Sequence, residues 1–536
     1  MTDAPPFALV DPSCSPPTVA IPRHYNAALD FVDRHVLEGR GAKVAFIHDR
    51  GRTTYGELAA QVARAGHALR ARGVRQETRV ALCLTDTIDF PIVFWGAVKI
   101  GAIPVPLNTL LTPQEYAYML HDSRARALVV SADLYPKIAP ALEGLTGLDA
   151  VLVAGAGDAH GHARLDDALA EQSVHLLAAQ TTCDDIAFWL YSSGSTGAPK
   201  GTMHLQSSLV HTAALYGRGI LAIEESDVIF SAAKLFFAYG LGNGMTFPMH
   251  VGATTVLLAD RPTPASVRAV LREHTPTLFG GVPTLFAAIL ADPALDPSAE
   301  GNRLRACISA GEALPADIGE RWRARFGVDI LDGLGSTEML HIFLSNRFDD
   351  VRFGTSGKPV PGYEVRVVDD AGHDVRAGDL GELLVNGPSA AAGYWNQRQR
   401  TLATFHGPWT RTGDKYFVDE DGYFHYAGRA DDMLKVSGIW VSPFEVESCL
   451  IAHADVLEAA VVACEDGDRL VKPKAFVVLR EGITGSRELE LELKTWVKTR
   501  LAPHKYPRWV EFVAALPKTA TGKIQRFKLR GPVPKT

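Results

Sequence analysis

Short apolar runs of Val, Ile and Leu alternate with segments of helical periodicity along most of the chain. A helix is predicted to begin at Thr54, because Thr54 and Glu57 have the spacing of a capping box and the apolar residues that follow recur on one helical face. Strands are predicted by the apolar runs at residues 79–84, 127–130, 150–153, 253–258 and 383–385. Strands that alternate with helices are typical of an α/β fold, which is the fold class we expect.

The pattern changes near Asp431. A charged stretch at residues 428–432 precedes strand-like runs at residues 456–464 and 475–479. A helix follows, and its inward face is predicted to consist of Leu489, Leu493, Trp496 and Val497. We therefore predict a large N-terminal domain, residues 1–430, and a small α+β C-terminal domain, residues 431–536, with the boundary near Asp431.

Composition narrows the class of protein. The 536 residues include 47% hydrophobic residues and carry a formal net charge of −7, which argues against a nucleic-acid binder. Six cysteines without a Cys-x-x-Cys spacing argue against a zinc site or a disulfide framework and favour a reducing cytoplasm. The N-terminal residues lack the order of a signal peptide. The longest apolar stretch, residues 90–107, is interrupted by Gly, Pro and Lys, so no membrane span is expected.

The most informative motif is Tyr-Ser-Ser-Gly-Ser-Thr-Gly-Ala-Pro-Lys-Gly at residues 191–201, which follows an apolar run. Glycines let backbone N–H groups face an anion, hydroxyls add donors, and Lys200 supplies a positive charge. A P-loop is excluded, because it has four residues between its glycines, whereas Gly194 and Gly197 are separated by two and Pro199 precedes the lysine. We predict a different phosphate-binding loop between a strand and a helix; a flexible surface loop is the alternative.

Further motifs follow apolar strands and end in small residues and a carboxylate. They are Ser-Ala-Gly-Glu at residues 309–312 and Asp-Gly-Leu-Gly-Ser-Thr-Glu at residues 332–338. Small residues admit a flat purine ring, Thr337 can reach a phosphate oxygen, and Glu338 suits a hard divalent cation. Asp414, predicted to lie on a turn, suits a ribose diol with Arg429 as a second contact. Each motif alone is equally well explained as a turn or a cap, so the interpretation depends on their joint occurrence.

In combination, order and spacing these motifs resemble those of the acyl-adenylating superfamily, which includes acyl- and aryl-CoA ligases, luciferases and peptide-synthetase adenylation domains. The resemblance runs from about Thr53 to Arg530. It implies catalytic roles for Thr337, Glu338 and Lys523, with Mg²⁺ on Glu338, and a hinge at Asp431 about which the C-terminal domain rotates. The ATP-binding residues that it implies are Ser192, Ser193, Gly194, Ser195, Thr196, Gly197, Lys200, Ala310, Gly311, Glu312, Asp332, Gly333, Leu334, Asp414 and Arg429. The family often has tyrosine where Leu334 stands, so the adenine contact would be aliphatic here.

Three further segments, residues 234–243, 335–343 and 432–439, resemble the benzoate-CoA ligase group of this superfamily. Their aromatic and small residues suit a flat apolar slot for a benzene ring, although such aromatics are commonly ordinary core. Amino-acid-activating relatives carry an aspartate where this chain has Leu235 and Phe236, which disfavours an α-amino acid substrate. The substrate-binding residues implied are Phe236, Phe237, Ala238, Tyr239, Gly240, Phe247, Gly335 and His341, and the His341 ring either lies against the aryl carboxylate or fills the wall.

The resemblance implies an ATP-dependent ligase that converts benzoate through benzoyl-AMP to benzoyl-CoA, with ATP, Mg²⁺ and coenzyme A. Ser437, Gly438 and Trp440 would line the tunnel for CoA. Gly280, where benzoate-preferring relatives are expected to carry tyrosine, leaves a hydroxybenzoate or an aminobenzoate as the alternative.

Other functions remain open at this point. They are an aryl acid loader of a separate carrier protein, a luciferase-like oxygenase and an inactive nucleotide-binding regulator, although Lys523 and Glu338 are both present, which argues against the last. The expected partners are small molecules, with neither nucleic acid nor membrane, and a homodimer is one option for the oligomeric state.

Overall fold

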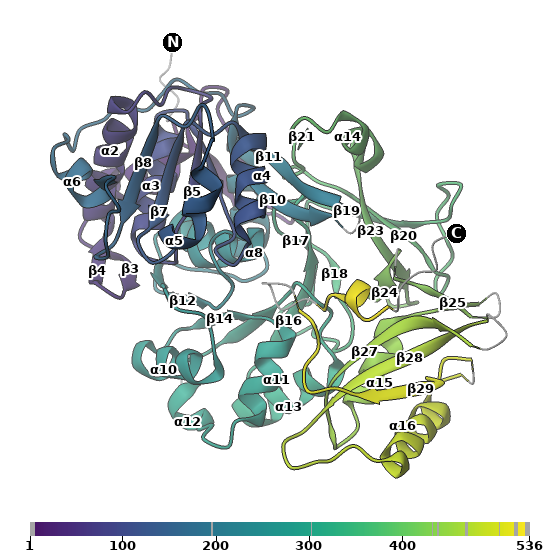
Figure 1. Ribbon diagram of the computed structural model, residues 1–536. Helices are drawn as coiled ribbons and strands as arrows, with labels where there is room; N and C mark the ends of the chain where they lie inside the picture. The colour runs from purple at the N-terminus through teal and green to yellow at the C-terminus, as the bar shows by residue number, and fades with distance from the viewer. Residues whose placement is uncertain are drawn as a thin grey trace.

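The structure, a computed structural model of the chain, describes residues 6–194, 197–301, 303–430, 432–436, 439–466, 470–502, 504–518 and 524–530. Figure 1 shows an N-terminal α/β layer in purple and blue, a second layer in teal, a mainly β layer in green and a C-terminal part in yellow-green. Strands alternate with helices in the first two layers, so the predicted α/β class is confirmed. Before these layers come β1 (Leu9–Asp11), β2 (Thr18–Ala20) and α1 (Arg34–Leu37).

The first layer is a parallel sheet with the strand order β6-β5-β7-β8-β9. The predicted helix is α2 (Tyr55–Ala71), and its capping box is confirmed, since Glu57 N donates to Thr54 Oγ1 at 3.2 Å and Thr54 N donates to Glu57 Oε2 at 2.8 Å. The strands are β5 (Arg79–Cys83), β6 (Ile103–Pro106), β7 (Ala127–Ser131), β8 (Ala150–Ala154) and β9 (Ala163–Arg164), and the other helices are α3 (Asp89–Lys99), α4 (Pro113–Ser123), α5 (Tyr135–Ile138) and α6 (Leu165–Ala170).

The longest apolar stretch of the sequence forms the buried helix α3 and strand β6 of this layer. α3 packs closely on α2, because a side chain at Gly96 would come within 2.7 Å of Ala65 Cβ. Lys99 is buried at the end of α3 and pairs with Asp33 at 2.7 Å. Among the described residues, no helix combines the length and the apolar character that crossing a membrane requires.

The second layer is a mixed sheet with the order β18-β17-β16-β15-β14-β12-β13-β3-β4. Its strands from β16 to β3 are parallel, so their carboxyl ends lie along one edge, where ligands bind in open α/β sheets. The strands are β3 (Val44–His48), β4 (Gly51–Thr54), β12 (Val228–Ser231), β13 (Thr254–Val256), β14 (Leu278–Gly281), β15 (Ala306–Ser309), β16 (Ile330–Gly335), β17 (Ile342–Ser345) and β18 (Lys358–Pro359). The helices are α7 (Gln206–Thr212), α8 (Ala238–Leu241), α9 (Phe247–Val251), α10 (Pro264–His274), α11 (Pro283–Ala291), α12 (Pro297–Glu300) and α13 (Ala316–Phe326).

The third layer contains the predicted phosphate loop and differs from the prediction in one respect. The loop joins β10 (Ile186–Gly194) to the antiparallel strand β11 (Gly197–Leu205), so it connects two strands of a hairpin and not a strand to a helix. β11 also pairs with β21 (Gly393–Tyr394). Beside this hairpin lies a sheet of β19 (Glu364–Val368), β20 (Gly381–Asn386), β22 (Phe405–His406), β23 (Trp409–Val418) and β24 (Phe424–Arg429), with helix α14 (Arg398–Thr404) nearby.

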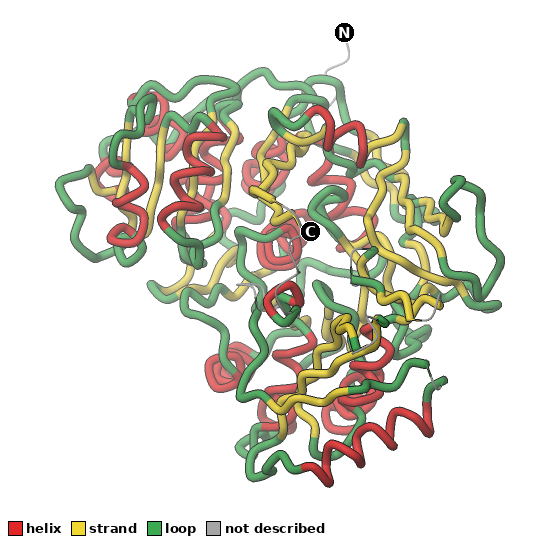
Figure 2. The backbone as a smooth tube through the Cα atoms, turned by 45° about the vertical axis from the view of Figure 1, so that its right-hand side comes forward, coloured by secondary structure: helices red, strands yellow, loops and turns green. Residues whose placement is uncertain are grey.

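The residues after 432 form apolar clusters of their own around the order β27-β28-β29. Helix α16 packs with α15 on one face of these strands, and Figure 2 shows it at the bottom of the molecule. Its inward residues Leu489, Leu493 and Val497 are buried as predicted, whereas Trp496 is only partly buried because its indole lies at the rim beneath Arg500. The elements are β25 (Leu434–Val436), β26 (Ile439–Val441), α15 (Pro443–Ile451), β27 (Val456–Glu465), β28 (Val471–Leu479), α16 (Arg487–Arg500) and β29 (Trp509–Phe512).

Candidate active site

A charged cluster forms where the β10–β11 hairpin meets the turn after β16. Lys200 Nζ donates to Glu338 Oε1 at 3.1 Å and to Tyr394 OH at 2.9 Å, and Tyr394 OH donates to the same Glu338 oxygen at 2.7 Å. Burial favours the neutral form of Glu338, but the Lys200 charge and the Tyr394 hydroxyl outweigh it and lower its pKa. Glu338 is therefore ionised, and a cation and an anion are held side by side at the end of the phosphate loop.

Sequence reasoning missed Tyr394. It lies in β21, which pairs with β11, and this pairing places its hydroxyl between Lys200 and Glu338. The only signal was an aromatic residue after Gly393, which has no spacing typical of a catalytic motif.

The structure describes some of the hydroxyl-bearing residues of the phosphate loop. Ser192 pairs with Lys200 in the hairpin ladder, and its Oγ is buried without a hydrogen-bond partner among the described residues. The backbone of Ser193 and Gly194 ends β10, and Gly197 begins β11. Ser195 and Thr196 lie outside the described residues. The two strands thus place the phosphate loop next to the contact between Lys200 and Glu338.

The two motifs predicted to contact adenine lie at the carboxyl ends of neighbouring strands, β15 and β16. Ala310 is buried, Gly311 has a φ of +95°, and Glu312 Oε1 accepts from the backbone N–H of Ile524 at 3.2 Å. The last contact joins this loop to the C-terminal end of the chain. Thr337 is half-buried in the turn that follows.

Asp332 is buried in β16 and accepts from Leu314 N at 3.3 Å. Burial raises the pKa of this carboxyl to about 8. The glycines around it serve packing, because a side chain at Gly333 would come within 2.7 Å of Leu344 O and one at Gly335 within 2.7 Å of the His341 backbone. Leu334 is half-buried between them.

Asp414 lies in a bulge of β23, and the predicted turn at this position is wrong. Residues 412–414 lie opposite a single position of β20, and Gly413 has a φ of +73°. Arg429 Nη1 donates to Asp414 Oδ1 at 3.0 Å and to Thr412 O at 3.1 Å. The bulge thus places the Asp414 carboxylate against the Arg429 guanidinium, and the ribose contact of these two residues stays a prediction.

The predicted aryl residues divide into two sets. His341 is packed by three rings: its centroid lies 4.4 Å from Phe247, 5.8 Å from Tyr239 and 5.1 Å from Tyr216, which sequence reasoning missed. We call these four residues the His341 ring set. The ring centroids of Phe236 and Phe237 instead lie 4.4 Å from each other, and Ala238 is half-buried. Gly240 leaves no room for a side chain, since a Cβ there would come within 2.1 Å of Lys234 O.

The His341 ring is neutral and is held in place among the aromatic rings around it. Burial lowers its pKa to about 3, and Nε2 lies 3.4 Å from the carbonyl oxygen of Tyr239. The Tyr239 hydroxyl lies 3.0 Å from Gly281 O and 2.9 Å from Ile308 O, which anchors the ring set to β14 and β15. The ring set thus lies at the same sheet edge as the nucleotide motifs.

Several predicted residues lie outside the described part of the chain. They are Lys523, Asp431, Ser437 and Gly438, and the side chain of Trp440 is likewise not described. Beside Asp431, Asp432 Oδ1 accepts from Arg530 Nη2 at 2.5 Å, and its Oδ2 lies 3.9 Å from Arg526 Nη1.

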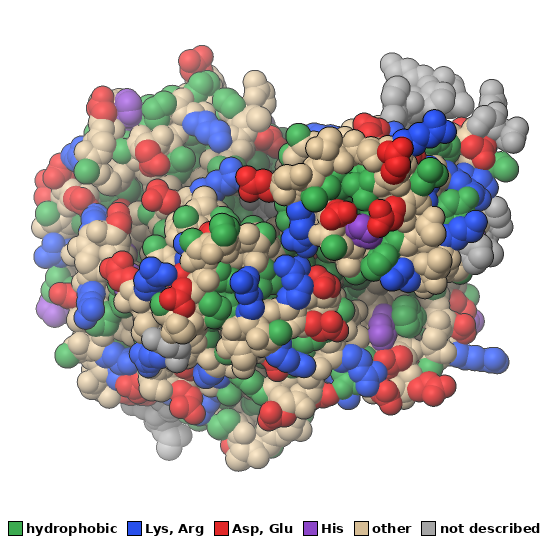
Figure 3. Space-filling model, turned by 90° about the horizontal axis from the view of Figure 1, so that it is seen from below, with side chains coloured by type: hydrophobic (Ala, Val, Ile, Leu, Met, Phe, Trp, Pro, Cys, Tyr) green, Lys and Arg blue, Asp and Glu red, His purple; other side chains and the backbone are tan. Residues whose placement is uncertain are grey.

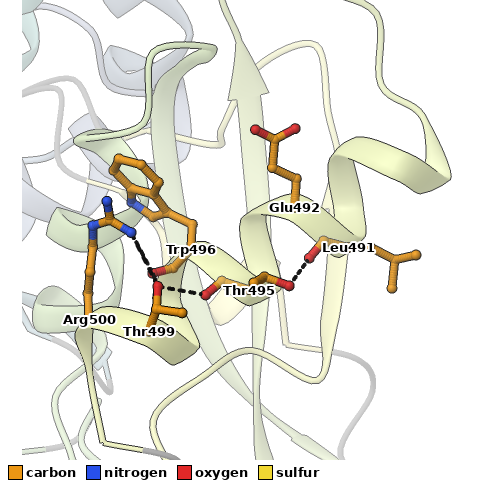
Figure 4. A pocket seen from close by; sticks show the side chains of 6 residues that line it. All are labelled: Leu491, Glu492, Thr495, Trp496, Thr499 and Arg500. Carbon is orange, nitrogen blue, oxygen red and sulfur yellow. Dashed lines mark hydrogen bonds between the residues drawn. The ribbon is translucent and has the colours of Figure 1, made fainter.

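The surface has two further features. A pocket of about 360 Å³ on α16 is lined by Leu491, Glu492, Thr495, Trp496, Thr499 and Arg500, with the Arg500 guanidinium 3.2 Å from the centre of the Trp496 ring (Figure 4). On the face seen from below, acidic and basic side chains are interspersed (Figure 3). None of the six residues that line the pocket on α16 was predicted to belong to the candidate site.

Comparison with known proteins agrees with this geometry. The family model of AMP-binding enzymes matches residues 33–395, and that of the AMP-binding enzyme C-terminal domain matches residues 445–523. The chain is 60% identical to a benzoate-CoA ligase of Thauera aromatica over 98% of this chain and 99% of that protein. It is 54% identical to a 4-hydroxybenzoate-CoA/benzoate-CoA ligase of Rhodopseudomonas palustris, over 95% and 94% of the two chains.

The fold is shared as well. The crystal structure of a benzoate CoA ligase from Burkholderia xenovorans superposes with a TM-score of 0.89 at 52% identity, covering 95% of this chain and 100% of the other. The chain therefore belongs to the family of AMP-binding enzymes, within the acyl-adenylating superfamily that its motifs resemble.

Proposed function

We propose that the protein is an ATP-dependent aryl-CoA ligase that converts benzoate through benzoyl-AMP to benzoyl-CoA, releasing pyrophosphate and AMP. The observation that carries this proposal is the turn between β16 and β17. One end of the turn holds Glu338 in the charged cluster with Lys200, and the other end places His341 in its ring set. A turn of six residues, Ser336 to His341, therefore carries both a group suited to ATP phosphates and a group suited to an aromatic acid. The 60% identity to a benzoate-CoA ligase supports the same function.

The first half-reaction joins the acid to AMP. A carboxylate oxygen of the acid forms a bond to the α-phosphorus of ATP, and the bond from that phosphorus to pyrophosphate breaks. Lys200 would hold phosphate charge at the hairpin, Asp414 and Arg429 the ribose, and Lys523 the charge that develops at the α-phosphate. These groups act by positioning and by stabilising charge.

Glu338 fits a magnesium site of the type that ATP-dependent enzymes use. Such sites bind Mg²⁺ through one or two protein carboxylates together with the substrate phosphates. Glu338 is an ionised carboxylate at the phosphate loop, and over the described ranges of the chain no group of three or more His, Cys, Asp or Glu residues forms an all-protein site. The ion would neutralise charge on the ATP phosphates.

The second half-reaction transfers the acyl group to CoA. The CoA sulfur forms a bond to the acyl carbon, and the bond from that carbon to AMP breaks. By resemblance to the family, the C-terminal domain turns about Asp431, withdraws Lys523 and brings Ser437, Gly438 and Trp440 to the pantetheine arm. The ion pairs of Asp432 with Arg526 and Arg530 support this, since they tie the residue beside the proposed hinge to the end of the chain.

A hydroxybenzoate or an aminobenzoate is the second candidate substrate. A methyl group at Gly280 would meet only ordinary contacts, the nearest at 3.4 Å, so there is room for one small group beside Tyr239. The relative from Rhodopseudomonas palustris is named for both 4-hydroxybenzoate and benzoate.

The test is pyrophosphate release by the purified protein with ATP and a panel of acids, with and without CoA. Benzoate and small ring-substituted benzoates are expected to exceed hexanoate and acetate in kcat/KM, because acetate leaves apolar surface unburied at a cost of about 25 cal/mol per Å². A higher value for hexanoate or acetate than for every benzoate would overturn the assignment.

The proposal includes a reducing cytoplasm as the place of action. All six cysteines are free thiols, as that setting requires. Size-exclusion chromatography with light scattering would give the molar mass of the protein and so decide between a monomer and the homodimer that the sequence allows.

A further inference from the structure

Asn243 carries a buried oxygen atom that has no hydrogen-bond partner among the described residues. The residue lies in the π-helical segment Gly242–Thr246 directly after α8, and it is 1% exposed. Its Nδ2 donates to the carbonyl oxygen of Tyr239 at 3.1 Å. This bond fixes the orientation of the amide, because a carbonyl oxygen can only accept. Oδ1 is therefore an acceptor that the fold itself leaves unpaired.

His341 contributes a second acceptor beside the same carbonyl. Its Nε2 lies 3.4 Å from Tyr239 O, so Nε2 carries the proton of the neutral ring. Nδ1 is then an acceptor, and it too is buried without a partner in the described part of the chain. Two acceptors on residues that bond to the Tyr239 carbonyl thus lack a donor.

The hydroxyl groups near Asn243 are already engaged. A methyl group at Gly280 would lie 3.7 Å from Asn243 Cβ, 3.6 Å from Tyr239 OH and 3.4 Å from Ser231 Oγ, so these groups surround one small space. The Tyr239 hydroxyl lies within hydrogen-bond distance of two backbone carbonyls, and Ser231 Oγ donates to Ala233 O at 3.1 Å. Neither hydroxyl has a proton left for Asn243.

We propose that Asn243 Oδ1, with His341 Nδ1, forms an acceptor subsite for a hydroxyl or amino substituent on the aromatic ring of the substrate. The inference rests on the proposed function and deepens it. Buried polar atoms in native proteins are almost always hydrogen-bonded, and these two unpartnered acceptors belong to residues that share the Tyr239 carbonyl, so a donor on the substrate ring would satisfy them. The enzyme therefore selects donor-bearing benzoates over benzoates that carry a methyl group of similar size.

The experiment compares kcat/KM for benzoate and for matched hydroxy-, amino- and methylbenzoates substituted at ring positions 2, 3 and 4. At one position at least, the hydroxyl or amino acid is expected to exceed its methyl counterpart by about tenfold or more, since a site built to hydrogen-bond a substituent rejects the analogue without it. Asn243→Leu is expected to lower this preference about tenfold.

Two further variants separate polarity from volume. Gly280→Ala fills the space. It is expected to lower kcat/KM for the hydroxyl-substituted and the methyl-substituted acids alike, relative to kcat/KM for benzoate. Met245→Leu is the matched control in the same segment: Met245 is fully buried in the apolar core, and this volume-conserving change is expected to leave the preference unaltered.

The outcomes are distinct. An unchanged hydroxyl-to-methyl ratio in Asn243→Leu would overturn the subsite while benzoate turnover leaves the proposed function standing. A wild-type protein that never prefers a donor over its methyl counterpart would overturn it without any variant, whether or not Asn243→Leu folds. If the wild-type protein turned over none of the benzoates, the proposed function itself would be contradicted.

Discussion

At the scale of single residues, the Tyr394 hydroxyl sets the geometry of the charged cluster. It donates to Glu338 at 2.7 Å and accepts from Lys200 at 2.9 Å, and burial raises its pKa, so it stays protonated. A hydrogen bond to a charged group contributes about 1.5–3 kcal/mol, so Tyr394→Phe is expected to slow adenylation about 10- to 100-fold. Benzoate-dependent pyrophosphate release measures this.

Tyr55→Phe is the control for Tyr394→Phe. The Tyr55 hydroxyl is also buried, and it donates to Ala253 O at 2.7 Å far from the candidate site along the sheet. This variant is expected to lose stability and to keep its adenylation rate. Equal rates for Tyr394→Phe and the wild type would contradict a positioning role.

Asp332 gives the pH dependence of stability a definite sign. Burial raises its pKa to about 8 in the folded protein, while the carboxyl in the unfolded chain has its ordinary value of 3.8. Between these values the folded protein retains a proton that the unfolded chain has lost, so this group makes folding less favourable as the pH rises from about 4 to 8. Asp332→Asn removes that dependence. In urea unfolding at pH 5, 7 and 9, the free energy of unfolding of the variant should rise relative to that of the wild type as the pH increases. A difference between the two proteins that stays constant with pH would contradict the assignment.

Single residues also show what sequence can and cannot provide. Lys200 and Glu338 were both predicted from motifs, because each motif carries its chemistry within a few residues. Tyr394 and Tyr216 were not, because strand pairing and ring packing bring them to the site from distant segments. Asn243 was missed for the same reason: its unpaired oxygen is a property of the packed structure.

At the scale of elements, the parallel strands explain why separate motifs form one site. The loops after β12, β14, β15 and β16 share an edge because these strands are parallel. The alternation of strands and helices in the sequence predicted the α/β class but not this shared edge. The hairpin at the phosphate loop was not predicted. β11 buries Thr202 and His204 while Met203 is half-buried, so polar residues face inward and the alternation that identifies a strand is absent.

Helix α2 offers a prediction at this scale. Thr54→Ala removes the side chain that accepts from Glu57 N, and loss of an N-cap costs about 1 kcal/mol of stability. The unfolding midpoint of the variant is expected to fall, with unchanged kcat/KM below the transition. Thr54→Ser retains the capping oxygen and should behave as the wild type. Reduced activity of folded Thr54→Ala would show that α2 does more than support the first layer.

At the scale of the whole molecule, the contact between Glu312 and the backbone of Ile524 joins the C-terminal segment to the loop after β15. Lys523→Ala is expected to slow adenylation about 10²–10³-fold, the typical cost of removing one such donor. The second half-reaction should be spared, because the charge is needed only while negative charge builds on the α-phosphate. The measurement is thioester formation from pre-made benzoyl-adenylate and CoA. If the variant used benzoyl-adenylate no better than benzoate, this division of labour would be wrong.

The proposed rotation of the C-terminal domain is tested at Asp431. Proline fixes φ near −65°, so Asp431→Pro is expected to oppose the rotation that brings the CoA tunnel to the acyl-adenylate. Pyrophosphate release should stay near the wild-type rate, thioester formation should fall, and benzoyl-AMP should accumulate. Lys523→Ala is the matched counterpart, because it should impair the first half-reaction alone. Opposite defects in the two variants would mean that one site is served by two arrangements of the C-terminal domain. An equal loss of both half-reactions in Asp431→Pro would count against a rotating domain.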